Sequence, residues 1–245
     1  MSTIRIERRF RGPPETANGG YVAGLVAAAL GGSNCTVTLK SPPPIGKDLT
    51  LTTGDATASL IWDDSVVVTA TSEPVEIEVP PPPSLADARD VEPRFAGHSH
   101  HIFPGCFVCG PERDEGDGMR IFPGRMHDKA HRVAATWTPD ETVTDDEGLV
   151  RPEFLWAALD CPGYFAAEEH AGMALLGRMS AVLHRRVRAG EPLVVTGWPI
   201  DSEGRKHWVG SALHDAKGEL VAAAKATWIT LNKEEPADDR PGASA

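Results

Sequence analysis

Residues 209–228 read VGSALHDAKGELVAAAKATW and form two alternating segments joined by the polar sequence DAKG. Residues 57–72, TASLIWDDSVVVTATS, show the same pattern with Asp-Asp at the join. Alternation of this kind predicts half-buried strands, and Asp- or Gly-containing joins are typical of hairpin turns. The two stretches therefore predict two similar antiparallel hairpins, one in each half of the chain.

Working outward from each hairpin, the same order of elements precedes it: an apolar helix, then strands. In the first half, the helix is expected at 18–32 (NGGYVAGLVAAALGG), and the strands at 35–40, 49–54, 57–62 and 65–72. In the second half, the helix is expected at 150–170, and the strands at 175–186, 192–198, 206–215 and 219–231, with two more before the helix at 118–124 and 131–139. This order predicts an α+β fold with an internal duplication, in which each helix packs along a curved antiparallel sheet.

A proline-rich segment, 72–95 (SEPVEIEVPPPPSLADARDVEPRF), separates the two halves. Four successive prolines favour an extended polyproline conformation and exclude a helix or a central strand there. We therefore expect an N-terminal unit at 1–75, a linker at 76–97, a C-terminal unit at 98–232 and a disordered acidic tail at 233–245.

Composition and charge narrow the class of protein. With 245 residues, 41% hydrophobic and 24% charged, the chain has the composition of a soluble globular protein. Its formal net charge of -11 argues against nucleic acid or an anionic membrane as the main partner. Its apolar runs are too short for a membrane span, its first residues do not form a signal peptide, and its 4 cysteines follow no disulfide pattern. These features predict a cytoplasmic protein.

Several motifs in this order carry a family resemblance. They are NGGYVAGL (18–25), CFVCGPERDEGDGMRI (106–121), Leu-Asp within the second helix, and GRK followed by DAKGELVAAAKATW near the end. Across most of 4–231 the chain resembles double-hotdog acyl-CoA thioesterases of the phenylacetyl-CoA thioesterase type. The resemblance implies two tandem hotdog folds, each a long helix wrapped by a curved antiparallel sheet, that together form a pseudo-dimer. It also implies an acyl-CoA substrate, no cofactor, and possible pairing of double-hotdog chains as a homodimer.

Asp160 is the residue that most needs an explanation. It interrupts the apolar helical run EFLWAALDCPGYFA (153–166), and a buried carboxylate is costly unless something binds or uses it. The resemblance implies that an acidic residue here acts as general base or nucleophile on a thioester. It also implies that a glycine-containing turn at a helix start supplies a backbone N–H to the thioester carbonyl, a role that suits the unpaired first-turn donors of any helix.

The two halves share these components unequally. Asn18-Gly19-Gly20 opens the first helix, but alanines around Ala27 occupy the place of the acid. The second helix has the acid, but Pro152 at its start has no N–H. If the helices lie antiparallel, as in a hotdog dimer, Gly19 or Gly20 meets Asp160 at one composite site per chain, and the second equivalent position lacks both groups.

Structural interpretations of the same residues remain open. Asp160 could cap a second helical segment whose first turn contains Pro162, or make a structural hydrogen bond. Asn18 could be a plain helix N-cap, with the glycines serving close packing.

Arg205 and Lys206 are candidates for binding the phosphates of coenzyme A, because guanidinium and ammonium groups pair well with phosphate oxygens. A solvated hairpin tip explains them equally well. Trp156 and Tyr164 could line an acyl pocket or belong to the core.

The stretch HSHHIFPGCFVCG (98–110) raises the question of a metal. Cys106 and Cys109 with two of the nearby histidines (His98, His100, His101) could supply four zinc ligands. The spacing is short and no second Cys-x-x-Cys accompanies it, so we predict a packed thiol turn and no metal.

These observations predict an acyl-CoA thioesterase. One alternative is a hotdog protein that binds acyl-CoA or another ligand without catalysis. Another is a hotdog hydratase or dehydratase, which needs a site histidine, whereas His170 at the far end is the first histidine on either helix. The sequence contains no Gly-x-Ser-x-Gly elbow and no phosphate-binding glycine loop.

Overall fold

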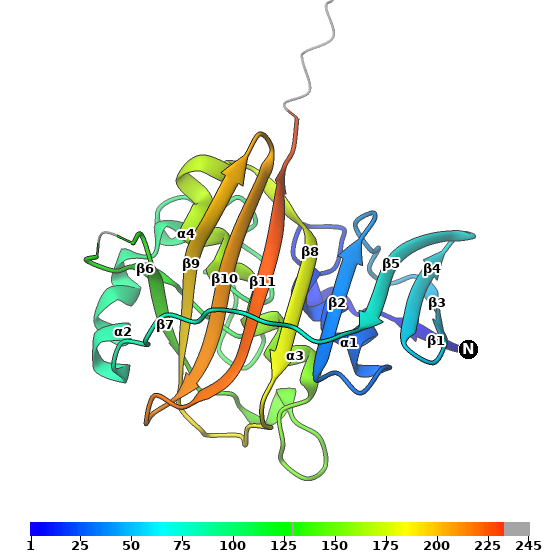
Figure 1. The fold of residues 1–245 in the computed structure, drawn as a ribbon, viewed down its shortest axis with the longest axis horizontal. Coiled ribbons are helices and arrows are strands. Elements are labelled where there is room, and N and C mark those ends of the chain that lie inside the picture. Colours follow the sequence, from blue (N-terminus) through cyan, green and yellow to red (C-terminus); the bar gives the residue numbers. More distant parts are fainter. Residues whose placement is uncertain (129, 233–245) are drawn as a thin grey trace, which may run out of the picture.

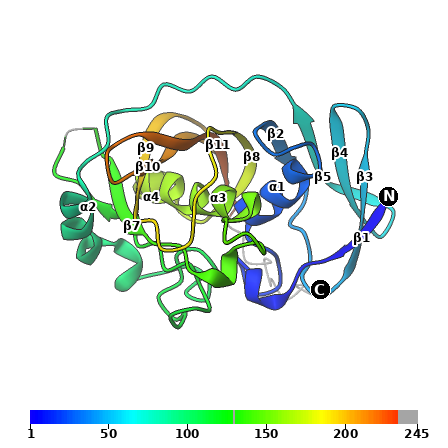
Figure 2. The same ribbon diagram turned by 90° about the horizontal axis from the view of Figure 1, so that it is seen from below.

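The computed structural model describes residues 1–128 and 130–232, which form one eleven-stranded sheet with the helices at 19–28, 152–158 and 160–171 on one of its faces (Figures 1 and 2). The strand order is β1-β3-β4-β5-β2-β8-β11-β10-β9-β7-β6. Neighbouring strands pair antiparallel throughout this order. The strands of the first half of the chain therefore form one end of the sheet, and the strands of the second half form the other end.

The N-terminal half consists of one helix and five strands. Its elements are α1 (Gly19–Ala28), β1 (Ser2–Arg5), β2 (Asn34–Leu39), β3 (Asp48–Thr53), β4 (Thr57–Trp62) and β5 (Ser65–Ser72). Asn18 caps α1, because its side chain accepts a hydrogen bond from the Tyr21 N–H. The predicted hairpin at 57–72 is confirmed as β4 and β5, and its turn places Asp63 and Asp64 at positive φ.

The C-terminal half contains three helices and six strands. Its elements are α2 (Leu85–Val91), α3 (Pro152–Ala158), α4 (Asp160–Ala171), β6 (Gly124–Arg125), β7 (Val133–Trp137), β8 (Ala174–Leu183), β9 (Leu193–Glu203), β10 (Lys206–Asp215) and β11 (Leu220–Thr230). The predicted hairpin at 209–228 is confirmed as part of β10 and β11.

Strands β2 and β8 join the two halves into one sheet. The hydroxyl groups of Thr36 and Ser180 lie 2.8 Å apart across this junction. Beneath it, α1 and α3 run in opposite directions, since Gly20 lies against Asp160 and Gly24 lies against Glu153. The sheet junction therefore sets the start of α1 beside the start of α4.

The chain between β5 and α2 crosses the outer face of the sheet, opposite α1, α3 and α4 (Figures 1 and 2). Ile77 and Val79 pack there against a small apolar cluster around Trp198. The predicted linker, 76–97, also contains α2, whose Ala88 and Val91 pack against residues of β7 and β9. This segment is therefore extended only in its first part.

The predicted continuous helix at 150–170 is wrong, because the structure divides it into α3 and α4 at Leu159. Pro162 explains the break: it has no N–H to donate to the Ala158 carbonyl, and its ring crowds that carbonyl. Next to this break, the Ser211 hydroxyl donates to the Leu159 carbonyl at 2.5 Å.

The predicted strand at 118–124 is also wrong, since only Gly124 of this segment belongs to a strand, β6. The Met119 and Ile121 N–H groups donate to the carbonyls of Phe107 and Val108. The segment therefore pairs with the Cys-x-x-Cys turn rather than with the sheet. Arg120, at φ 53, bends the backbone between these two bonds.

Within the described part of the chain, no helix is long and apolar enough to cross a membrane. The predicted acidic tail at 233–245 lies outside the described residues.

Candidate active site

Asp160 is the first residue of α4 and is 1% exposed. Its side chain makes no capping bond to α4 within the described structure, where Leu159 stands at the N-cap. Instead it points to the start of α1. The capping interpretation of Asp160 is therefore wrong for its own helix.

One oxygen of Asp160 is fully engaged by α1. The Gly20 N–H and the Asn18 side-chain amide each donate to Oδ2 at 2.9 Å. The other oxygen, Oδ1, is buried without a hydrogen-bond partner among the described residues. Burial raises the pKa of Asp160 to about 7, although the bonds from Gly20 and Asn18 oppose this shift and a nearby Cys106 thiolate adds to it.

The two glycines at the start of α1 have different roles. A Cβ on Gly20 would lie 2.5 Å from the Asp160 Cβ and 2.8 Å from the Trp156 carbonyl oxygen, so only glycine allows this approach. Gly19 lines a cavity, and its N–H takes part in none of the hydrogen bonds among the described residues. The predicted meeting of this turn with Asp160 is thus present, and it leaves the Gly19 N–H as the free donor.

The cavity beside Asp160 has a volume of about 690 Å³, which suits a small organic group. It lies between the segment at 12–19 that leads into α1, the length of α4, the loop at 100–109, the end of β2, the start of β8 and the end of β11. Its apolar lining comes largely from side chains of these elements: Ile102, Phe103, Tyr164, Phe165, Leu175, Leu176, Trp228 and Ile229. Asp160 and Gly19 therefore adjoin a largely apolar chamber.

The other predicted site residues lie in different places. Tyr164 lines the cavity, donates its hydroxyl to the Gly172 carbonyl at 2.8 Å, and has a pKa raised to about 12 by burial. Trp156 lies in the core, fully buried. Arg205 and Lys206 are exposed where β9 turns into β10, and Arg205 pairs with the backbone of Thr230, next to the cavity-lining Ile229.

Sequence reasoning missed two parts of the site. Lys40 follows β2 and lines the cavity, but its position in the sequence, at the end of a predicted strand, carries no such signal. The second part is a group of thiols: Cys161, next to Asp160, joins Cys106 and Cys109, and the three sulfur atoms lie within 4.8 Å of one another. The sequence showed the Cys-x-x-Cys turn, but it gave no sign that Cys161 would lie beside it.

The thiol groups affect one another strongly. Hydrogen bonds from the Cys109 and Cys161 thiols hold the pKa of Cys106 well below its usual range. Burial raises the pKa of Cys109, while the interaction with Cys106 raises that of Cys161. The predicted histidines lie in different surroundings. His98 is exposed and lies edge-on against Phe95, whereas His101 contacts the Cys109 sulfur at 3.3 Å and burial lowers its pKa.

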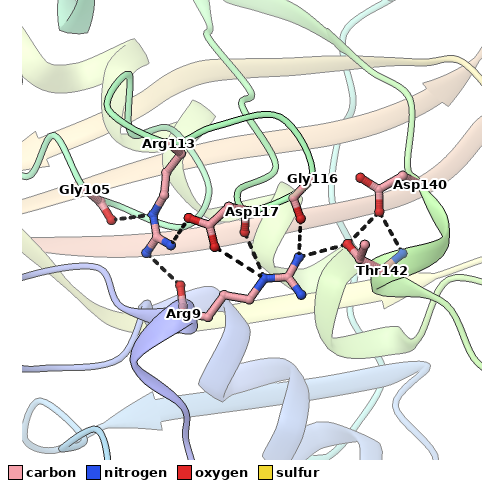
Figure 3. A network of polar contacts seen from close by, with 7 residues as sticks. All are labelled: Arg9, Gly105, Arg113, Gly116, Asp117, Asp140 and Thr142. Carbon is pink, nitrogen blue, oxygen red and sulfur yellow. Dashed lines mark hydrogen bonds and ion pairs between the residues drawn. The ribbon is translucent and has the colours of Figure 1, made fainter.

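The loop that carries Cys106 and Cys109 is fastened to the N-terminal segment (Figure 3). The buried Arg113 guanidinium donates to the carbonyls of Gly105 and Arg9 and pairs with Asp117 at 2.7 Å. Arg9 in turn donates to the Asp117 carbonyl and to the Thr142 hydroxyl. These bonds hold one wall of the cavity in place.

Comparisons with known proteins give no matching family model and no match among curated protein sequences. Solved structures do match over nearly the whole chain. The tesB protein of Mycobacterium avium subspecies paratuberculosis aligns with a TM-score of 0.59 and 14% identity over 94% of this chain and 92% of its own. A Novosphingobium aromaticivorans protein, named provisionally as a thioesterase, aligns with a TM-score of 0.61 and 12% identity over 94% of this chain and 95% of its own.

A conserved protein of unknown function from Alicyclobacillus acidocaldarius, described as having a hot dog fold, aligns with a TM-score of 0.61 and 14% identity, over 94% of this chain and 93% of its own. At these identities the likeness establishes the fold. The chain thus has a hotdog architecture, and the resemblance inferred from its sequence is confirmed at that level.

Proposed function

We propose that this protein is an acyl-CoA thioesterase with one composite site, built from the start of α1 and the start of α4. The observation that carries the proposal is a buried carboxylate, Asp160, with one oxygen unpartnered among the described residues, beside the unused N–H of Gly19 on a cavity wall. The Novosphingobium aromaticivorans structure of the same fold, named provisionally as a thioesterase, supports this choice by analogy.

In the proposed reaction, the thioester carbonyl oxygen accepts a hydrogen bond from the Gly19 N–H. This donor stands at the first turn of α1, where the helix dipole favours the negative charge that develops on the oxygen. Asn18 and Gly20 hold Oδ2 of Asp160, so Oδ1, which has no hydrogen-bond partner among the described residues, is the oxygen left to act on the thioester.

Asp160 then acts in one of two ways. As a general base, it takes a proton from water as the water oxygen bonds to the thioester carbon, and the coenzyme A thiolate leaves with the electrons of the broken C–S bond. As a nucleophile, it bonds to the thioester carbon and expels the coenzyme A thiolate, which leaves with the electrons of the C–S bond; water then hydrolyses the resulting mixed anhydride and restores the Asp160 carboxylate. Both routes require an ionised carboxylate next to the carbonyl and yield a carboxylic acid and free thiol.

The acyl group would occupy the apolar cavity, and the coenzyme A portion would leave it between the ends of β2 and β11. Lys40 lines the cavity, and Arg205 pairs with the backbone of Thr230, next to the cavity-lining Ile229. Lys206 is the neighbouring cation on β10. These positive groups suit the phosphates of coenzyme A in a chain that is otherwise acidic.

We also infer that the two halves of the sheet are two hotdog units that pair as a pseudo-dimer within one chain. The antiparallel contact of α1 with α3 and the pairing of β2 with β8 support this arrangement. It explains why the site takes its N–H donor from one half and its carboxylate from the other. Pairing of whole chains into a homodimer remains a prediction.

The test is thiol release from short, medium, long and aromatic acyl-CoAs by the wild-type protein and by Asp160→Asn. We expect turnover of at least one class and a loss of about 10²–10⁴-fold in the variant, since a general base or nucleophile contributes that much. Asparagine can still accept the hydrogen bonds from Gly20 and Asn18, so the fold should be kept.

The rival function, ligand binding without catalysis, predicts a different result. In that case wild-type protein would release no thiol from any acyl-CoA, while calorimetry would still detect binding. Equal turnover by wild-type protein and Asp160→Asn would also contradict the proposal, because it would place the chemistry elsewhere.

A further inference from the structure

Three buried thiols meet on the cavity wall, and the proposed thioester hydrolysis uses none of them. Cys106 and Cys109 come from the loop before β6, and Cys161 from the first turn of α4. Their sulfur atoms all lie within 4.8 Å of one another, and the Cys106 and Cys161 sulfurs are 3.9 Å apart. We propose that the three thiolates bind one Zn²⁺ ion. This proposal is independent of the thioesterase activity.

The spacing of the sulfurs matches what zinc requires. A Zn–S distance of about 2.3 Å in a tetrahedral site places two ligand sulfurs roughly 3.8 Å apart. The distance of 3.9 Å between Cys106 and Cys161 is close to this value. Cys106 and Cys109 also have the two-residue separation that tight-turn zinc ligands use. Little movement would be needed for the ion to sit between the three sulfurs.

His101 supports the thiolates rather than completing the ligand set. Its Nδ1 accepts the Phe103 N–H at 3.0 Å, so the ring proton of the neutral imidazole is on Nε2. Nε2 lies 3.3 Å from the Cys109 sulfur, to which it donates this proton. Hydrogen bonds of this kind orient ligands and strengthen metal binding without contact to the metal.

The fourth position of the tetrahedron would then open to the cavity, because all three cysteines line it. Zinc sites with three protein ligands keep such a position for water or another small ligand. The ion would therefore hold the wall next to Asp160 and remain reachable from the chamber.

The chain holds these ligands in place without the metal. Arg113, 5% exposed, fastens the backbone of Gly105 to that of Arg9. The Phe107 N–H donates to the Arg11 carbonyl at 2.8 Å, between the two cysteines of the turn. Cys161 is fixed by its place in α4. A prearranged set of soft ligands favours a thiophilic ion such as Zn²⁺ over Mg²⁺ or Ca²⁺.

The first experiment is a titration of the full-length, reduced protein with Co²⁺ under anaerobic conditions. We expect thiolate-to-cobalt charge-transfer absorption together with the visible bands of tetrahedral Co²⁺, saturating at one ion per chain. Zn²⁺ should abolish these bands by displacement. Folded, reduced wild-type protein that shows no such bands would overturn the proposal, and no variant is needed for that result.

Substitutions then assign the ligands. Cys161→Ser and Cys109→Ser should lose the cobalt spectrum, whereas Cys35→Ser should keep it, since Cys35 is also buried but lies in β2. His101→Asn should keep one ion per chain with affinity about 10–100-fold weaker. Bands that survive in Cys161→Ser would contradict the three-thiolate site.

A redox role for the same cysteines is the competing outcome. It predicts that air-exposed protein loses two of its thiols to a disulfide, and that the reduced form binds no Co²⁺. That pair of results would overturn the zinc site. Thiol release from acyl-CoA is measured separately, so failure of either proposal leaves the other to be judged alone.

Discussion

The structure has two sites where the start of one helix packs against another helix, and each contains a buried acidic residue. The two sites differ in the groups that contact this residue. At the start of α1, Asp160 forms no ion pair among the described residues and is held by two neutral donors, Gly20 and Asn18. At the start of α3, Glu153 is also buried, at 6% exposed, but pairs with Arg151 at 3.3 Å. Burial of an acid is therefore not in itself a sign of function here.

The donors at the two places differ as well. Gly19, a cavity-lining residue, begins α1 and has a backbone N–H, whereas Pro152 begins α3 and has none. Arg151, which neutralises Glu153, also lies over the Phe154 ring at 4.8 Å. The second place is thus closed by an ion pair and a proline. The first keeps a desolvated carboxylate and a free donor, which is the arrangement that chemistry on a carbonyl requires.

The strongest test of this comparison is Gly19→Pro. It removes the backbone N–H at the start of α1, as Pro152 does at the start of α3. Proline suits the first position of a helix, and the extended backbone of Asn18 (ψ 132) tolerates a proline after it. We expect turnover to fall by about 10²–10³-fold, the loss typical of one oxyanion donor.

Gly19→Ala is the matched control for this variant, because it adds the same Cβ near Leu176 and keeps the N–H. It should retain most of the activity. If steady-state kinetics give equal losses for the two variants, the N–H is not the carbonyl donor and the effect is steric.

Alanine substitutions at two glycines of α1 test whether the close approach of α1 to α3 and α4 is required. A Cβ on Gly20 would lie 2.5 Å from the Asp160 Cβ, and one on Gly24 would lie 2.5 Å from the Glu153 Cα. We expect either alanine to lower the free energy of unfolding by about 1–3 kcal/mol, measured by urea denaturation. Only Gly20→Ala should also reduce turnover in the folded protein, because it displaces Asp160. Full activity in that variant would count against Asp160.

The smallest expected effects are on the stability of the fold, and they have opposite signs for substitutions of Asp160 and Glu153. Asp160→Asn removes a desolvated charge that no cation offsets, so we expect it to stabilise the fold by about 1–2 kcal/mol. Glu153→Gln removes one partner of an ion pair and should destabilise it by roughly 1 kcal/mol, since Arg151 stays partly solvated. Thermal unfolding at neutral pH measures both. Shifts in the same direction would show that the two acids are equivalent.

Much of this arrangement could be predicted from local patterns. The hairpins at 57–72 and 209–228, the helix after Asn18, and Asp160 as the unexplained acid all follow from alternation, turn residues and the cost of burying charge. The strand predicted at 118–124 failed because its alternation serves pairing with Phe107 and Val108, two residues of a loop. The predicted helix at 150–170 failed at Leu159, where Pro162 already marked a break.

The sequence by itself determined the repeated order of helix and strands, the proline that deprives α3 of a donor, and the residues from which a composite site could form. Only the tertiary structure decided that Gly20 binds Asp160 while Gly19 stays free, that Arg151 neutralises Glu153, and that Cys161 joins Cys106 and Cys109. Local patterns report the conformation of neighbouring residues. Contacts between atoms far apart in the chain depend on how the β2–β8 pairing sets one half against the other, and no short stretch encodes that distance.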